Sequence, residues 1–278
     1  MNDTRSILLA ALLGVSIFAG NFSWWFQSQV VDPEAFVASA TVALSREESR
    51  DAIGELIAER LTAEVPILLI IESSLASLFS NLFATSSFGS VIGFVAEDVH
   101  GRIVTGDTGA VVVTLEQYRD DIMAPFEAIA PQLAALVPSS WFESVEILTA
   151  GTLPDISRAA QVASRILFLA FLVAAMALVL LVRDKKGRNR ATALVGGAFI
   201  FGGVMSGIFV PLGQRFGIGP TDSGQIDVLY SNIYNEITRS LWRSAAVLVL
   251  IGTVILMVAV VVHGPLRQSG EPPLPDRQ

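Results

Sequence analysis

Few side chains in this sequence are of the types that catalysis or metal binding needs. The chain contains no cysteine, so thiolate metal sites, cysteine nucleophiles and disulfides are excluded. Its only histidines are His100 and His263, and neither belongs to an H-E-x-x-H motif. The phosphate-binding pattern G-x-x-x-x-G-K-[ST] and the serine pattern G-x-S-x-G are both missing. We therefore expect no P-loop and no serine triad.

Two adjacent acidic pairs, Glu97-Asp98 and Asp120-Asp121, are the remaining candidates for acid–base chemistry. Neighbouring residues on a helix point in different directions, so neither pair can share a proton as a dyad. The oxygen-ligand spacing of a calcium loop is also missing. We interpret these acids as solvated surface and expect no metal and no cofactor. An enzyme would need some of these acids to converge with His100 in one pocket.

The segment that organises the chain is Ile166–Val182, which is apolar throughout and is followed by a cationic cluster. An apolar run of this length is just long enough to cross a hydrocarbon core as a helix. The chain is 52% hydrophobic with a mean hydropathy of +0.60, which also favours membrane spans. Dense Lys and Arg beside a span mark the cytoplasmic side. The cations are Arg183, Lys185, Lys186, Arg188 and Arg190.

The hydropathy pattern predicts a mainly α protein with four transmembrane helices, an extracytoplasmic, mostly helical domain and a small β element. The predicted parts are a cytoplasmic start (1–5), spans at 6–26, 161–183, 191–213 and 241–263, an extracytoplasmic domain (27–160), a basic cytoplasmic loop (184–190), an outer loop (214–240) and a disordered tail (264–278). A cleaved signal peptide competes with the first span, but the small residues that cleavage requires do not line up.

This topology places both termini in the cytoplasm of a bacterial cell, in a multi-pass protein of the plasma membrane. His100 and His263 then lie on opposite sides of the bilayer and cannot share a zinc ion. Trp24, Trp25 and Trp242 are expected to anchor span ends at the membrane–water interface, as amphipathic rings do.

Small residues repeat along the third predicted span, at Gly202, Gly203, Ser206 and Gly207. Such rows let helices approach closely in lipid. We expect them to contact another span of the same chain, or alternatively a partner protein or a second copy. No ionisable residue interrupts the middle of any span, which weighs against a proton or ion pathway.

Acidic residues dominate the predicted extracytoplasmic domain. Residues 27–160 hold 19 Asp and Glu against 6 Lys and Arg, a net charge of 6 − 19 = −13. This composition argues against nucleic-acid binding, which requires a basic face, and we expect no nucleic-acid partner. The simplest interpretation is a water-facing surface.

Within this domain the patterns predict several local structures. Asp32-Pro33 should start a helix as N-cap and first residue, and Ser45–Glu48 has the form of a capping box. A helix from Ser87 should end at His100-Gly101. Further predictions are a hairpin of Arg102–Thr105 with Ala110–Leu115 and a short β run at Val145–Thr149, for which Ala110–Leu115 is one possible partner. We also expect a helix after Thr114 that Pro125 and Pro131 bend or interrupt, and a helix from Pro154 into the second span.

The segment Pro66–Ala84 has three open interpretations. Its length would allow a fifth span. Polar residues such as Glu72 and Asn81 interrupt it, and its leucines form a stripe at helical spacing. We interpret it as a core helix of the domain, with a membrane-surface or re-entrant helix and a true span as the alternatives.

Two stretches, Val31–Leu61 and Ala150–Leu169, carry a resemblance to uncharacterised multi-span membrane proteins common in actinobacteria. The resemblance implies an amino-terminal span, a helical outer domain and three clustered carboxy-terminal spans. It implies no activity. In Pro66–Ala84 this chain is more apolar than the family pattern.

These observations together favour a non-enzymatic membrane protein that acts as an accessory or partner-binding subunit of a cell-envelope complex. The partners expected are the lipid bilayer and, through the third span, another membrane protein or a second copy. The alternative function is the handling of lipid or another hydrophobic ligand at the outer membrane–water interface, suggested by Pro66–Ala84.

Overall fold

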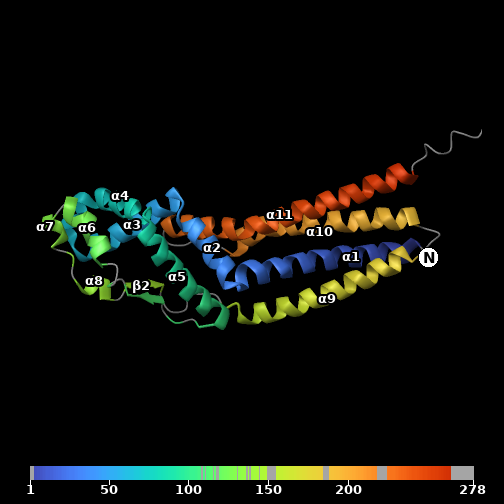
Figure 1. The fold of residues 1–278 in the computed structure, drawn as a ribbon, viewed down its shortest axis with the longest axis horizontal. Coiled ribbons are helices and arrows are strands. Elements are labelled where there is room, and N and C mark those ends of the chain that lie inside the picture. The colour runs from blue at the N-terminus through green and yellow to red at the C-terminus, as the bar shows by residue number, and fades with distance from the viewer. Residues whose placement is uncertain are drawn as a thin grey trace, which may run out of the picture. The chain divides into compact units, whose positions relative to one another are not determined.

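The computed structural model describes residues 3–107, 109, 111–114, 116, 119–129, 131–135, 137, 139–143, 145–148, 155–183, 188–217 and 224–263. Throughout these residues the fold is mainly α-helical (Figure 1). The chain forms two compact units. We call the first, Met1–Trp25 with Ala163–Pro211 and Ser240–Gln278, the bundle, and the second, Phe26–Val162 with Leu212–Arg239, the acidic unit.

In its described part, the bundle is built from the helices α1 (Asp3–Trp25), α9 (Ser157–Val182), α10 (Arg188–Gly217) and α11 (Gly224–His263), of which the last three extend into both units. They run side by side (Figure 1). Small residues set their spacing: Ala163, Ala170 and Ala177 are the buried face of α9 together with Leu181. A methyl group at Gly20 would touch the Cβ of Ala170 at 3.6 Å, so α1 packs on this face.

The spans of the sequence analysis fall within longer helices. α10 begins at Arg188, so the predicted basic loop 184–190 is wrong in its last three residues. α10 continues to Gly217 and α11 is continuous from Gly224, so both helices extend into the predicted outer loop 214–240. An unbroken run of helix-compatible residues, without Pro or Gly between 225 and 251, explains the continuity of α11.

The start of α9 is fixed by a local cap. The Asp155 carboxylate accepts hydrogen bonds from the Ser157 hydroxyl at 2.6 Å and from its backbone N–H at 2.9 Å. Both hydrogen bonds hold the pKa of Asp155 below its ordinary value, and the bond from the hydroxyl has the larger effect. The helix therefore begins at Ser157, and the predicted start at Pro154 lies outside the described residues.

The acidic unit contains the shorter elements. These are η1 (Phe26–Val31), α2 (Pro33–Leu44), α3 (Glu47–Glu64), η2 (Pro66–Ile71), α4 (Glu72–Phe83), α5 (Ser86–Thr105), β1 (Val111–Val113), α6 (Arg119–Ile129), α7 (Pro131–Ala134), α8 (Ser140–Glu143) and β2 (Val145–Leu148). η1 is a π-helix and η2 a 3₁₀-helix.

Two capping predictions had different outcomes. Asp32 is confirmed as the N-cap of α2, since its side chain accepts a hydrogen bond from the N–H of Ala35 at 2.9 Å. The capping box at Ser45–Glu48 is wrong: Arg46 is the N-cap of α3 and makes no side-chain cap. The Ser45 hydroxyl donates instead to the carbonyl of Val42, because Ser45 ends α2 rather than starting α3.

The predicted hairpin is wrong because α5 continues through Arg102–Thr105 and past the expected stop at His100-Gly101. An ion pair between Arg102 and Asp98, four residues apart, supports the last turns. Gly106 then ends the helix in the left-handed conformation at φ 77°, which glycine adopts without strain. β1 pairs with β2 in antiparallel register, Val113 opposite Val145.

The interruption expected in the helix after Thr114 is found at Pro131, since α6 ends at Ile129 and α7 starts with that proline. Pro125 lies within α6.

The core of the acidic unit forms around the segment whose interpretation was open. Pro66–Ala84 is divided into η2 and α4, and its leucines pack inward. Leu68, Leu75 and Phe79 belong to a buried cluster with Leu61 of α3 and Phe142 of α8. Pro66 begins η2, where its missing N–H is tolerated.

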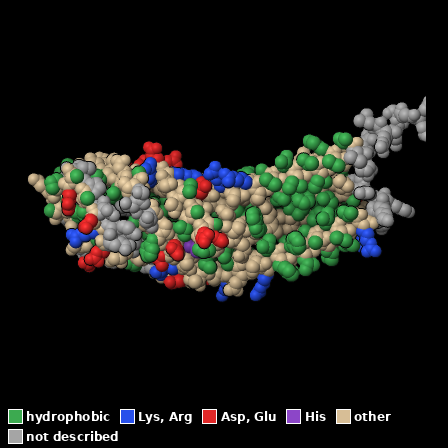
Figure 2. Space-filling view, viewed as in Figure 1, with side chains coloured by type: hydrophobic (Ala, Val, Ile, Leu, Met, Phe, Trp, Pro, Cys, Tyr) green, Lys and Arg blue, Asp and Glu red, His purple; other side chains and the backbone are tan. Residues whose placement is uncertain are grey.

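Within the described residues, five helical segments are long and apolar enough to cross a membrane: Asp3–Val31, Pro66–Phe83, Ser157–Val182, Arg190–Arg215 and Gly224–Val261. Figure 2 shows hydrophobic side chains gathered on the surface of the bundle helices and carboxylates on the acidic unit.

Candidate binding surface

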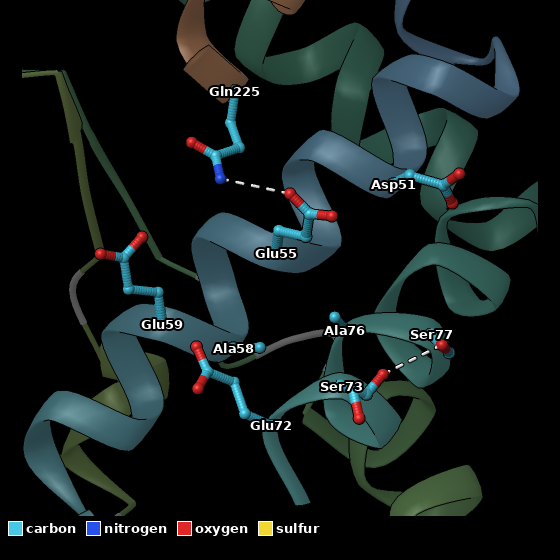
Figure 3. A pocket seen from close by; sticks show the side chains of 9 residues that line it. All are labelled: Asp51, Glu55, Ala58, Glu59, Glu72, Ser73, Ala76, Ser77 and Gln225. Atoms are coloured by element: carbon cyan, nitrogen blue, oxygen red, sulfur yellow. Dashed lines mark hydrogen bonds between the residues drawn. The ribbon is translucent and has the colours of Figure 1, made fainter. Parts of the chain in front are cut away.

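Three carboxylates of the acidic unit lie in one row along α3. Asp51, Glu55 and Glu59 are spaced by four residues, which places them on the same face of the helix. Glu72, the first residue of α4, lies across from them (Figure 3). These four acids line a hollow of about 570 Å³, which we call the carboxylate cleft. The remaining lining residues are Ala58, Ser73, Ala76, Ser77 and Gln225.

A glycine lets the two walls of the cleft approach. A methyl group at Gly54 of α3 would lie 2.4 Å from the carbonyl oxygen of Ala76 in α4, so no larger residue fits there without a shift of the backbone. The Ser80 hydroxyl, one turn further along α4, donates a hydrogen bond to Asp51. This close crossing holds the row of α3 carboxylates opposite the first turn of α4.

The third wall is the start of α11. The Gln225 amide donates to Glu55 at 3.2 Å. Two further contacts hold this part of α11 against α3: the Asn232 amide donates to the buried Ser49 hydroxyl at 2.9 Å, and Arg46 pairs with Glu236. The position of Gln225 in the cleft therefore depends on one buried and one half-buried contact as well as on its own hydrogen bond.

The charge of the cleft is not neutralised from within the described part of the chain. The ion pairs found there join Arg46, Arg102, Arg190 and Arg239 to acids other than these four. Like charges four residues apart destabilise a helix by about 0.2–0.5 kcal/mol per pair. The row on α3 therefore costs some stability and creates a negative, solvent-exposed surface.

Metal coordination does not follow from this arrangement. No group of three or more His, Cys, Asp or Glu side chains in the described residues is close enough to hold an ion. A diffuse negative surface of this kind attracts cationic groups and orients them on approach.

An exposed apolar patch adjoins the cleft along the chain. Ile67, Leu69 and Ile70 are 64%, 57% and 86% exposed, and we call these three residues the apolar ridge. They lie on η2, whose last residue immediately precedes Glu72 of the cleft. Apolar and acidic surface therefore meet at the junction of η2 and α4.

The predicted packing residues lie at helix contacts inside the bundle. A methyl group at Gly202 would lie 2.6 Å from Ile17 of α1, and one at Gly203 would lie 2.7 Å from the carbonyl of Ala245 in α11. Ser206 is fully buried and accepts a hydrogen bond from Asn21 at 3.0 Å. Gly207 faces the ring of Trp242.

The predicted interface anchors have different surroundings. Trp24 is 57% exposed and Trp242 is 52% exposed. Trp25 is buried and its ring lies 5.4 Å from that of Phe22. A ring in this setting packs within the bundle.

Of the predicted topology residues, Arg183 is exposed and Arg190 pairs with Asp3 across the bundle. Arg188 is the first residue of α10. Lys185 and Lys186 lie outside the described residues.

The acid–histidine pocket that an enzyme would need does not form around His100. This side chain is buried, its Nε2 donates to the carbonyl of Val30 at 3.0 Å, and its ring packs 5.0 Å from that of Phe36. Asp98 pairs with Arg102 instead. Glu97 and Asp120 are exposed. His100 is a core histidine that ties α5 to η1.

Sequence reasoning missed the row of acids on α3, although its signal was present. The four-residue spacing of Asp51, Glu55 and Glu59 is legible in the sequence. Nothing in the sequence indicated that Gln225, far along the chain, would complete the cleft.

No protein-family model, curated protein or solved structure matches this chain.

Proposed function

We propose that this protein is a four-span membrane protein that binds a partner protein through the acidic unit, as a non-enzymatic accessory subunit of a cell-envelope complex. The observation that carries the proposal is the contrast in surface between the two units. The bundle exposes apolar side chains along its helices, and the acidic unit exposes carboxylates.

The exposed apolar side chains of the bundle support lipid contact. Phe168 and Phe171 of α9 are 67% and 76% exposed, and Met257 and Val261 of α11 are 62% and 81% exposed. Burying such a side chain is worth about 1.5–3 kcal/mol relative to leaving it in water. A bilayer removes that penalty for every one of them at once.

The charges around the fifth apolar segment support a count of four spans rather than five. Pro66–Phe83 changes from a 3₁₀-helix to an α-helix at Glu72 and packs on α3, which carries the exposed acids of the cleft. Charged side chains are costly in the middle of a bilayer. This segment therefore belongs outside the hydrocarbon core.

The cations between α9 and α10 support a cytoplasmic position for that connection, with both termini on the same side. Labelling of intact cells tests this orientation. A cysteine introduced at Lys185 should resist a membrane-impermeant maleimide until the cells are opened, whereas one at Glu97 should react at once. Reaction at position 185 in intact cells would show that the protein has the opposite orientation.

Native mass spectrometry after gentle extraction into lipid nanodiscs tests the function. We expect a second polypeptide to remain bound to a stoichiometric fraction of the protein. The proposal would be contradicted if the nanodiscs contained only a lone chain, with neither a partner nor a second copy.

The exposed ridge on η2 favours the handling of a hydrophobic ligand as the second candidate. Such ligands require a hollow lined mainly by apolar side chains. The carboxylate cleft is lined by acids and serines instead, which is why partner binding is preferred.

A further inference from the structure

We infer that the apolar ridge and the carboxylate cleft form one docking surface, and that its occupant is a polypeptide segment carrying both apolar and basic side chains. The inference rests on the proposed function and names the partner's chemistry. Its parts are Ile67, Leu69 and Ile70 on η2, and Asp51, Glu55, Glu59 and Glu72 around the cleft.

The geometry of the 3₁₀-helix separates the ridge from the core. Side chains three residues apart are eclipsed in this helix. Ile67 and Ile70 therefore share one face, and Leu68 and Ile71 share another. The second face packs into the buried cluster, where Leu68 is fully buried. The apolar residues of the first face contribute nothing to that core.

The ridge is also distinct from the scattered apolar residues of ordinary protein surfaces. Single exposed apolar side chains need no explanation, but a contiguous group marks a contact surface. Among the described residues, Ile70 is the most exposed large apolar side chain, at 86%. It lies two residues before Glu72, so the ridge and the cleft adjoin each other along the chain.

The charge of the cleft selects the occupant. The four carboxylates lack a cationic partner among the described residues, and a Lys or Arg side chain from outside would supply one. Apolar anchors in such a surface provide most of the affinity, and the surrounding charges provide orientation and speed of association.

The same charge argues against a membrane as the occupant. An anionic bilayer surface attracts basic segments and repels carboxylates. A neutral bilayer would accept the ridge and leave the adjoining acids with no compensating contact. A basic, apolar polypeptide segment satisfies both halves of the surface at once.

Photo-crosslinking in cells that express the full chain tests this inference. Benzoylphenylalanine replaces Ile70, and in a matched control it replaces Phe94, which is 57% exposed on α5 of the same unit. We expect a crosslinked protein from position 70 only. Mass spectrometry should locate the crosslink in a segment that contains apolar residues together with several Lys or Arg.

A charge variant separates the two halves of the surface. Glu55→Gln with Glu59→Gln should lower the crosslink yield at position 70 by about three- to tenfold, as expected for the loss of two exposed charge contacts. Glu97→Gln on α5 is the matched control and should leave the yield unchanged. An unaltered elution profile in detergent checks that each variant is folded.

Four outcomes would overturn the inference: no product at position 70, a product with lipid, a product with a segment that lacks basic residues, or a yield that the double variant does not change. If a partner is retained in the native mass spectrum and any of these outcomes is found, the docking surface is refuted but the proposed function is not. A lone chain without any crosslink would remove the proposed function as well.

Discussion

The bundle and the acidic unit use exposed apolar residues in opposite ways. In the bundle they occur along all of the described helices, for example at Leu8 of α1 and Leu250 of α11, both 64% exposed. Among the described residues of the acidic unit they are mostly isolated, as at Val42 and Phe94, and the ridge is the one contiguous group. The same exposed fraction is therefore compatible with lipid contact in the bundle and, under our proposal, with a localised docking site in the acidic unit.

The packing of the two units differs in the same sense. Buried alanines and glycines bring the bundle helices together, whereas leucine and phenylalanine fill the core of the acidic unit. Water drives large apolar side chains inward, but lipid does not, so helices in lipid associate through close backbone contact. The contrast indicates which solvent each unit is built for.

The largest effect should distinguish the two faces of η2. Leu68→Ala should destabilise the acidic unit by about 2–5 kcal/mol, because it leaves a cavity in the buried cluster. Ile70→Ala, at an exposed position of the same helix, should change stability by no more than about 0.5 kcal/mol. Chemical denaturation, monitored by hydrogen exchange of the α3 and α4 amides, measures both changes in stability. Equal losses would place Ile70 in the core and remove the ridge.

Close approach in the bundle is tested by a pair of glycines on α10. Gly203→Ala brings a methyl group to within 2.7 Å of the Ala245 carbonyl, and we expect a loss of about 1–3 kcal/mol from the forced shift of α11. Gly197→Ala meets no atom within 4 Å and should be neutral or slightly stabilising. Thermal unfolding in detergent compares them. If Gly203→Ala behaves like Gly197→Ala, the helices do not depend on this contact.

The helices were predictable where a single local signal decided them. Asp32 before Pro33 specified the start of α2, and the apolar run at Ile166–Val182 specified most of α9. The hairpin failed because β-branched residues at 102–105 follow an established helix, and the pairing of Arg102 with Asp98 continues it. Propensity over four residues is too weak to outweigh helix continuation.

The cleft was only half predictable. The row of acids on α3 follows from their spacing alone. The position of Glu72 opposite that row depends on the crossing of α3 and α4 at Gly54. The position of Gln225 depends on the buried hydrogen bond between Asn232 and Ser49. Contacts between residues that are distant along the chain cannot be recognised from the pattern of a single sequence. The division of Pro66–Ala84 at Glu72 was hidden for the same reason.

A buried hydrogen bond between α1 and α10 tests how the bundle helices are held together. Ser206→Ala removes the hydrogen bond from Asn21 inside the bundle and should cost about 0.6–1.7 kcal/mol. Ser244→Ala is the control, since that hydroxyl donates only within α11, to the carbonyl of Leu241. Unfolding in mixed micelles measures the difference. An equal effect of both substitutions would show that the contact between α1 and α10 contributes nothing of its own.

The smallest effect has the opposite sign and concerns the acids themselves. Glu59→Gln removes the like-charge pair with Glu55 and should stabilise the acidic unit by about 0.2–0.5 kcal/mol. Glu97→Gln should give no such gain, because no Asp or Glu lies three or four residues away. Denaturation at low salt resolves the gain, and raising the salt should shrink it by screening. A row of acids that costs stability, and whose removal weakens crosslinking at Ile70, would be retained for binding rather than for folding. A loss of stability in Glu59→Gln would instead mean that the row holds α3 in place.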